Sequence, residues 1–184
     1  MSDVYEMLKR AYGFDGRMNE KVLDEIKAQG IGAKEESENA LVDGNWQVRA
    51  AALRVLGILE MEADNAKIKP LLNDSHPEVR KNAIFALRKL KDATAIPLLL
   101  KSLKDPNGAI WVEAGFAVTE LSSETTIPFF TMALNDYDWS VRAVALSSLS
   151  KLSSPNVLSI MKQHVQREGN ELCKAIIERT IRAR

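Results

Sequence analysis

The sequence has little of the chemistry that metal sites and disulfides require. Its 184 residues contain one cysteine, Cys173, and two histidines, His76 and His164. A single cysteine cannot form a disulfide within the chain, and no cluster of cysteine and histidine has the spacing of a zinc site. We therefore expect no metal and no cofactor. This use of cysteine fits a reducing cytosol.

Motifs for phosphate binding and covalent catalysis are also missing. The chain has nine glycines, but neither GxxxxGK[ST] nor GxGxxG occurs. No serine, cysteine or threonine stands in a pattern that indicates a nucleophile with its base. The two histidines lie far apart in the sequence and are poor candidates for a catalytic base. We expect a protein that is not an enzyme.

The sequence has no excess of charge and no long hydrophobic run. Lysine and arginine together number 25, as do aspartate and glutamate. Sequence-independent nucleic-acid binders gain most of their affinity by neutralising phosphates, so this balance argues against nucleic acid as a partner. No stretch approaches the roughly 18 apolar residues of a membrane span, and the first residues are acidic where a secretory signal needs a basic start. We expect no membrane partner and a cytoplasmic location.

What the sequence does have is an internal repeat of 31 residues. Aspartate occurs in four copies at this interval, at Asp43, Asp74, Asp105 and Asp136. Four apolar columns keep the same register without an insertion. They are Val48, Val79, Ile110 and Val141; Ala52, Ala83, Ala114 and Ala145; Leu56, Leu87, Val118 and Leu149; and Leu41, Leu72, Leu103 and Leu134. A period of this length is typical of a solenoid.

Each repeat reads as two helices joined by a turn that contains the aspartate. The first helix has an early proline in two copies, at Pro97 and Pro128, where proline costs no needed hydrogen bond. The second helix, for example 78–90, carries one apolar stripe made of Val79, Ala83, Ala86, Leu87 and Leu90. One helix pair cannot bury this stripe alone, so the pairs must stack. The sequence predicts an all-α solenoid of about five antiparallel helix pairs.

The ends of the chain keep the repeat less well. Helices are expected near 1–13, 19–30 and 33–42, and we interpret residues 1–42 as a degenerate repeat that caps the stack, because the outer face of a terminal unit must be polar. Residues 43–165 form the regular repeats, and residues 166–184 are expected to form a closing, capping helix.

The pattern Asp-x4-Val-Arg-x2-Ala-x3-Leu, preceded by a helix with Ile-Pro, resembles HEAT repeats, in particular the short bacterial and archaeal kind of the phycobilisome lyases. The resemblance is strong over residues 41–152. It implies a right-handed superhelix whose second helices line the concave side. It also implies a ladder in which each aspartate pairs with the arginine of its own or the next repeat, formed by Asp43, Asp74, Asp105 and Asp136 with Arg49, Arg80 and Arg142. Trp111 occupies the arginine column, so we expect Asp105 to lack its partner.

The face opposite the buried stripe predicts a binding surface. One column there holds Arg54, Phe85, Phe116 and Ser147, and its neighbour holds Ala50, Lys81, Val112 and Ala143. We expect Phe85, Phe116 and Val112 to form one exposed apolar patch that contacts a partner. Further candidate contacts on these helices are Trp111, Glu113, Lys81, Asn82 and Arg54. The alternative is that a neighbouring helix covers the phenylalanines, or that the helical phase is off by one position. Trp46 and Trp139 are expected to pack as staples where the second helices begin.

These features favour a non-catalytic scaffold that binds another protein on its concave face. Two alternatives stay open. Trp111, Glu113 and Trp139 suit a DNA-binding protein or an alkylated-base glycosylase built from HEAT-like repeats, although the expected excess of basic residues is missing. The family resemblance alone suggests a bilin lyase or chaperone-like helper. The acidic beginning and basic end of the chain leave weak self-association open as well.

Overall fold

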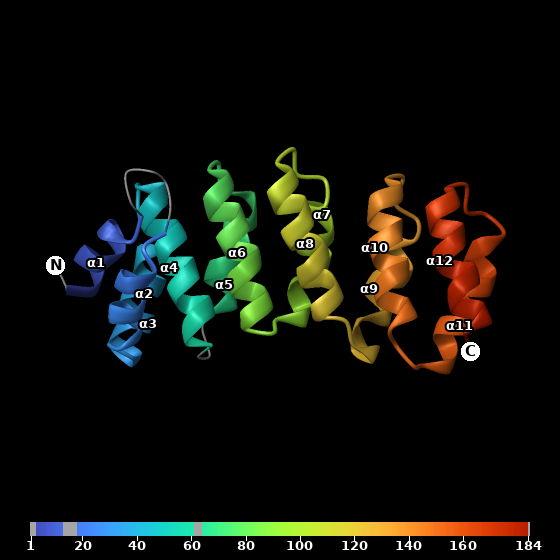
Figure 1. Cartoon of the computed structure of the whole chain (residues 1–184), viewed down its shortest axis with the longest axis horizontal. Helices are drawn as coiled ribbons and strands as arrows, with labels where there is room; N and C mark the ends of the chain where they lie inside the picture. The colour runs from blue at the N-terminus through green and yellow to red at the C-terminus, as the bar shows by residue number, and fades with distance from the viewer. Residues whose placement is uncertain (1–2, 13–17, 61–63, 184) are drawn as a thin grey trace. The chain divides into compact units, whose positions relative to one another are not determined.

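The computed structural model describes residues 3–12, 18–60 and 64–183. Within these residues the fold is all-α, with twelve α-helices and three short 3-10 helices and no strand (Figure 1). The prediction of an all-α protein is confirmed. The chain divides into two compact units, Met1–Ala95 and Ile96–Arg184. The domain limits expected from the sequence, at 42 and 165, stay a prediction.

The first unit is built around one helix, α4. Its elements are α1 (Asp3–Arg10), α2 (Glu20–Lys27), α3 (Ile31–Ala40), α4 (Trp46–Leu59), α5 (Asn65–Ile68), η1 (Lys69–Asn73), α6 (Pro77–Lys89) and η2 (Ala93–Ala95). Helix α4 contacts α6 and α3, and α1 and α2 also pack against it. Ala50 and Leu53 are therefore completely buried. Ala50 belongs to a column that was expected to face solvent, and at this position the expectation was wrong.

The second unit is a more regular stack of helix pairs. Its elements are α7 (Ile96–Ser102), α8 (Gly108–Glu120), η3 (Glu124–Thr126), α9 (Ile127–Ala133), α10 (Trp139–Ser150), α11 (Pro155–Val165) and α12 (Glu171–Arg182). Helix α7 packs on α8, α9 on α10, and α11 on α12. The second helices α8, α10 and α12 lie side by side in that order (Figure 1). Because one antiparallel helix separates each from the next, all three run in the same direction.

The repeated columns form the core of each unit. The members of the valine and alanine columns are at most 2% exposed at all eight positions: Val48, Val79, Ile110, Val141, Ala52, Ala83, Ala114 and Ala145. Alanine in the middle of each second helix lets the neighbouring helix approach closely, while the larger side chains fill the remaining space. In α12 the corresponding places are taken by Cys173 and Ile177, both fully buried.

The same turn leads into each second helix. The Asp105 carboxylate accepts a hydrogen bond from the backbone N–H of Asn107 (2.9 Å), and the Asn107 side chain accepts one from the N–H of Ala109 (3.0 Å). Asn107 is therefore the N-cap of α8. Before α12, Glu168 and Asn170 make the same two bonds. Glu168 thus continues the aspartate column, one residue later than the period predicts.

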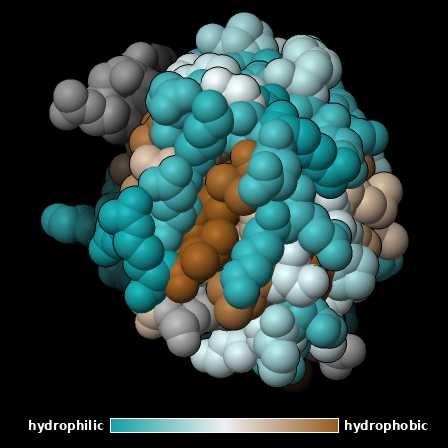
Figure 2. Space-filling view, turned by 90° about the vertical axis from the view of Figure 1, so that its right-hand side faces the viewer, coloured by the Kyte–Doolittle hydropathy of each residue, from teal (hydrophilic) through white to brown (hydrophobic). Residues whose placement is uncertain are grey.

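Helices α11 and α12 form the last face of the second unit. Figure 2 shows this face, on which a stripe of hydrophobic residues runs between two rows of hydrophilic ones. The exposed side chains of these helices include Lys162, Glu178 and Arg182. A mostly polar outer face is what a capping element needs.

Candidate functional site

Exposed large apolar side chains are concentrated in the second unit. Among the described residues nine such side chains are exposed, and only Ile31 and Val42 belong to the first unit. The seven in the second unit are Trp111, Val112, Phe116, Met132, Tyr137, Trp139 and Leu172. Clusters of this kind usually mark a binding surface, which favours the second unit as the location of the site.

Five of these seven side chains line one groove, which we call the apolar groove. It has a volume of about 530 Å³ and is formed mainly by α8, α10 and α12; it is lined by Leu103, Trp111, Val112, Gly115, Phe116, Thr119, Trp139, Ser140, Ala143, Val144, Ser147, Lys151, Leu172 and Ile176. Lys151 is the one charged side chain among these described residues. The surface offered to a ligand is therefore mostly hydrocarbon and aromatic.

Small residues between large ones create the hollow. Gly115 carries no side chain, and a Cβ built there would lie 3.8 Å from Leu103 Cδ2 and 3.9 Å from Val144 Cγ2. Thr119 donates its hydroxyl to the carbonyl of Gly115 (2.8 Å), so its polar group is already bonded within α8. Phe116, between them in sequence, is 65% exposed. The groove is therefore deep at Gly115, and the Phe116 side chain projects beside it.

The structure brings three of the predicted contact residues together and adds two more. Phe116, Val112 and Trp111 all line the groove. Trp139 and Leu172 also line it, although Trp139 was interpreted as a staple and Leu172 was not singled out. Both stand at the start of a second helix, one residue or two after its N-cap. A large apolar residue just after the N-cap of a second helix is therefore the sequence signal that could have identified both.

Phe85 has different surroundings, in the first unit. Its ring lies 4.0 Å from the guanidinium carbon of Arg54 and 5.6 Å from that of Arg88. It also packs over Gly57, where a Cβ would come within 2.7 Å of the ring. Phe85 is half-buried, so the expectation that it forms a bare apolar surface was wrong. Cations above an aromatic face are attracted by its ring electrons, which explains why Arg54 and Arg88 lie over the Phe85 ring.

Asn82 is also removed from the surface. It is 3% exposed, and its side-chain amide donates to the Glu78 carbonyl (2.8 Å) and to the hydroxyl of Tyr12 (3.1 Å). Asn82 was expected on the exposed face of its helix, but it is buried because Tyr12 covers this part of α6. Burial raises the pKa of the Tyr12 hydroxyl above its ordinary value.

The other candidates in this region have their own settings. The Lys81 ammonium lies 2.8 Å from Glu78 Oε2. Glu113 is half-buried on α8 and is not among the residues that line the groove. Trp46, expected as a staple, stacks on His76 with 3.6 Å between the ring centroids.

The aspartate and arginine columns connect successive repeats. Arg49 donates to both carboxylate oxygens of Asp74 (2.9 Å each) and to the backbone carbonyl of Asp43 (2.7 Å). The arginine thus binds the backbone of its own turn and the carboxylate of the following one. Arg80 likewise donates to the carbonyl of Asp74 (2.9 Å). Such bidentate, charge-assisted pairs fix the orientation of both groups.

Trp111 interrupts this series at a different rung from the one expected. Because Arg49 reaches the carboxylate of the following turn, the missing arginine at 111 affects Asp136, and Asp105 is not without a partner. Lys104 approaches Asp136 Oδ2 to 2.8 Å instead. Burial alone would raise the pKa of Asp136, but the hydrogen bond from Lys104 holds it below its ordinary value. The tryptophan that replaces the arginine is free to line the groove.

The last rung joins α10, α11 and α12. Arg142 donates to both carboxylate oxygens of Glu168 (2.9 and 2.8 Å) and to the carbonyl of Asp136 (2.9 Å). His164 Nε2 lies 3.0 Å from Glu168 Oε2. The hydrogen bonds from Arg142 lower the pKa of Glu168 to about 2. Sequence reasoning missed Glu168, because it stands outside the 31-residue register.

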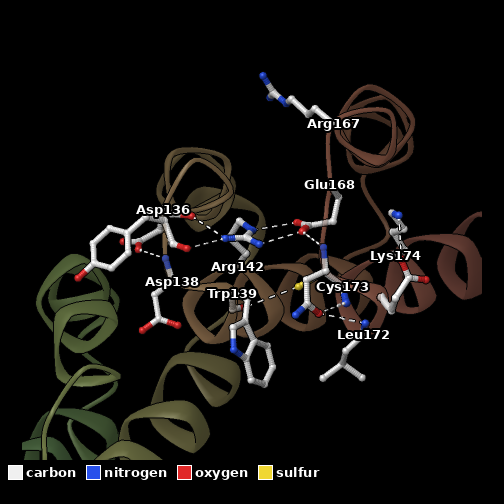
Figure 3. A network of polar contacts seen from close by, with 12 residues as sticks. Asp136, Asp138, Trp139, Arg142, Arg167, Glu168, Leu172, Cys173 and Lys174 are labelled. Atoms are coloured by element: carbon white, nitrogen blue, oxygen red, sulfur yellow. Dashed lines mark hydrogen bonds and ion pairs between the residues drawn. The ribbon is translucent and has the colours of Figure 1, made fainter.

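This rung also positions two groove residues. Figure 3 shows the Trp139 and Leu172 side chains pointing to the same side, away from the Arg142 and Glu168 ion pair. The Cys173 thiol, next to Leu172, donates to the carbonyl of Trp139 (3.5 Å). The starts of α10 and α12 are therefore held together by polar contacts on one side and present apolar side chains on the other.

The groove has the chemistry of a contact surface. Its lining side chains are apolar groups, hydroxyls and one ammonium, with no carboxylate, imidazole or thiol among the described residues. Nowhere in the described part of the chain do three potential metal ligands gather. None of the helices in that part is long and apolar enough to cross a membrane.

Comparison with solved structures shows the fold. The chain is similar to an archaeal HEAT-like repeat protein from Thermococcus onnurineus NA1, with 13% identity, a TM-score of 0.67, and 98% of this chain and 79% of the other covered. It is also similar to a designed armadillo repeat protein in complex with the peptide (KR)4 (16%, 0.60, 99% and 99%) and to an engineered protein (17%, 0.59, 99% and 98%). The predicted α-solenoid is confirmed. The comparison with curated proteins gave no match.

The family comparison agrees with the repeat read from the sequence. The family described as HEAT repeats matches residues 37–114 and 103–182, which together span most of the chain. These segments include the columns that form the core and the turns that begin the second helices. The chain belongs to the HEAT-repeat family.

Proposed function

We propose that this chain is a non-catalytic scaffold that binds a segment of another protein in the apolar groove. The observation that carries the proposal is the gathering of five exposed apolar side chains on three neighbouring second helices. Trp111, Phe116 and Trp139 offer large areas of hydrocarbon, and tryptophan is among the residues that contribute most to binding energy in protein interfaces.

The fold class supports the same proposal. HEAT-like and armadillo scaffolds present a row of parallel second helices, and the designed armadillo protein that this chain resembles holds a peptide. The groove here is lined by one cation, which is a poor track for the phosphates of a nucleic acid. A protein segment with apolar side chains matches the lining better.

The test compares two exposed residues of the same unit. Phe116→Asp places a charge in the groove, whereas Met132→Asp places the same charge on α9, outside the groove. Phe116 is 65% exposed and Met132 74%, so neither change should lower the melting temperature by more than a few degrees. Proteins of the native lysate that bind the wild-type chain should also bind Met132→Asp. They should bind Phe116→Asp at least about tenfold more weakly.

A photoreactive side chain placed at position 119 would identify the contact directly. Thr119 lines the groove, so a cross-link from this position to the captured protein is expected, and Phe116→Asp should abolish it. Capture that is equally strong with Phe116→Asp would show that the partner binds elsewhere and would contradict the proposal.

A further inference from the structure

The two ends of the apolar groove differ in charge. Trp139 and Leu172 lie at the end where α10 and α12 begin, and Lys151 lies just beyond the end of α10. A second hollow of about 490 Å³ adjoins the groove there, because Ser147 and Ile176 line both. Arg179 of α12 lines this second hollow. One end of the combined surface is therefore aromatic, and the other carries two cations.

The charges of Lys151 and Arg179 are not neutralised by the described residues of the chain. Both side chains are exposed, and no described carboxylate lies within ion-pair distance of either. Their neighbours on α12 differ in this respect, because Lys174 pairs with Glu171 and Arg182 with Glu178, each at 2.9 Å. Among the described residues, no carboxylate lines the groove or the second hollow. The positive charge is available to an incoming group.

The spacing suits a short peptide. From Trp139 to Lys151 the chain rises along α10, whose 12 residues span about 18 Å. An extended segment covers this distance with about six residues, at roughly 3.3 Å each. Apolar side chains over the tryptophans and a carboxylate over the cations can therefore belong to one continuous segment.

We propose that the occupant of the groove is a protein segment that carries apolar residues and, within about six positions of them, aspartate or glutamate. The apolar side chains lie against Trp111, Phe116 and Trp139, and the carboxylate lies between Lys151 and Arg179. This proposal rests on the proposed function and adds the chemical class of the ligand and its register in the groove. Complementary charge at one end specifies the register of the segment, while the apolar contacts supply most of the affinity.

The experiment selects ligands from a random 12-residue peptide display library on three forms of the full chain. These are the wild type, the charge reversal Lys151→Glu with Arg179→Glu, and the control Lys101→Glu with Lys162→Glu. The control changes the net charge by the same amount at two exposed lysines outside the groove. Thermal melting of each form verifies that the fold is retained.

The expected result is enrichment of peptides that carry apolar residues and, within about six positions of them, aspartate or glutamate, on both the wild type and the control. A synthetic peptide from this set should bind the charge reversal about tenfold more weakly, and its affinity for the wild type should fall as salt increases. Substituting lysine for its acidic residues should restore binding to the charge reversal.

Three other outcomes would contradict the charge proposal. Binding of the enriched peptides to Phe116→Asp is measured as well. Enriched peptides without acidic residues that bind Phe116→Asp more weakly than the wild type would overturn the charge proposal and leave the proposed function intact. Acidic peptides that bind wild type and charge reversal equally would overturn it as well. No enrichment on any form, or enrichment that does not depend on Phe116, would overturn both.

Discussion

At the scale of single residues, small side chains decide where the large ones can lie. Gly57 on α4 leaves room for the Phe85 ring, and Gly115 on α8 deepens the groove beside Phe116. Phe85 and Phe116 occupy the same column of the repeat, yet Phe116 is 65% exposed and Phe85 is half-buried. The column predicted both as surface residues. It could not show that Arg54 and Arg88 lie over one ring, because the direction of a long flexible cation is set by its neighbours in space.

Gly57→Ala should destabilise the chain. The new Cβ would lie 2.7 Å from one carbon of the Phe85 ring and 3.1 Å from the backbone of Ala86, and the backbone cannot move aside without repacking α6. We expect a loss of about 1–3 kcal/mol in the free energy of unfolding, as for other overpacked sites. Urea unfolding followed by circular dichroism measures it.

The matched control for this substitution is Gly108→Ala at the start of α8. A Cβ there meets nothing within 4 Å, so stability should be unchanged or rise by up to about 1 kcal/mol. Equal losses for the two variants would mean that contact with Phe85 is not the cause.

At the scale of elements, the turn before each second helix is the most predictable part of the chain. The aspartate column indicated its place, and the structure adds that the residue two positions later caps the helix. Glu168 was missed because two changes coincide. One extra residue precedes it, and glutamate replaces aspartate. The glutamate side chain is longer than that of aspartate, and it still reaches Arg142. A strict period cannot reveal a position where length and identity change together.

Glu168 should make stability depend on pH in the acidic range. Its pKa is about 2 in the folded chain and near 4.5 when unfolded, so between these values the unfolded chain binds more protons and acid favours unfolding. Above pH 4.5 its full contribution, on the order of 3 kcal/mol, is present, and it is lost as the pH falls toward 2. Arg142, His164 and Asn170 face this carboxylate and determine the shift.

Glu168→Gln tests this pH dependence. The substitution should destabilise the chain strongly at pH 7 and less at pH 3, as measured by urea midpoints at the two values. Glu171→Gln is the control, because Glu171 is 86% exposed and pairs only with Lys174 among the described residues, so its removal should have little effect. A difference between wild type and Glu168→Gln that stays constant from pH 7 to 3 would refute the assignment.

At the scale of the whole molecule, the sequence predicted the repeat architecture but not which second helices stay open. The sequence predicted helices within residues 1–42, but their loose period did not show on which helix they pack. In the structure α1 and α2 cover α4, which leaves the first unit with few exposed apolar side chains. The second unit has no such cover on α8, α10 and α12 in the described residues, so its apolar side chains line a groove.

Repeat architecture also predicts how far along the chain a destabilising substitution acts. In a stack each helix pair contacts mainly its neighbours, so a local loss of stability should remain local. Glu168→Gln breaks contacts among α10, α11 and α12, and amide hydrogen exchange in peptides from α11 and α12 should become at least about tenfold faster at neutral pH. Exchange in α1 to α4 should not change. Mass spectrometry of exchanged peptides distinguishes this from a uniform acceleration along the chain, which would mean that the molecule opens as one cooperative unit and that its stability is not a sum over neighbouring repeats.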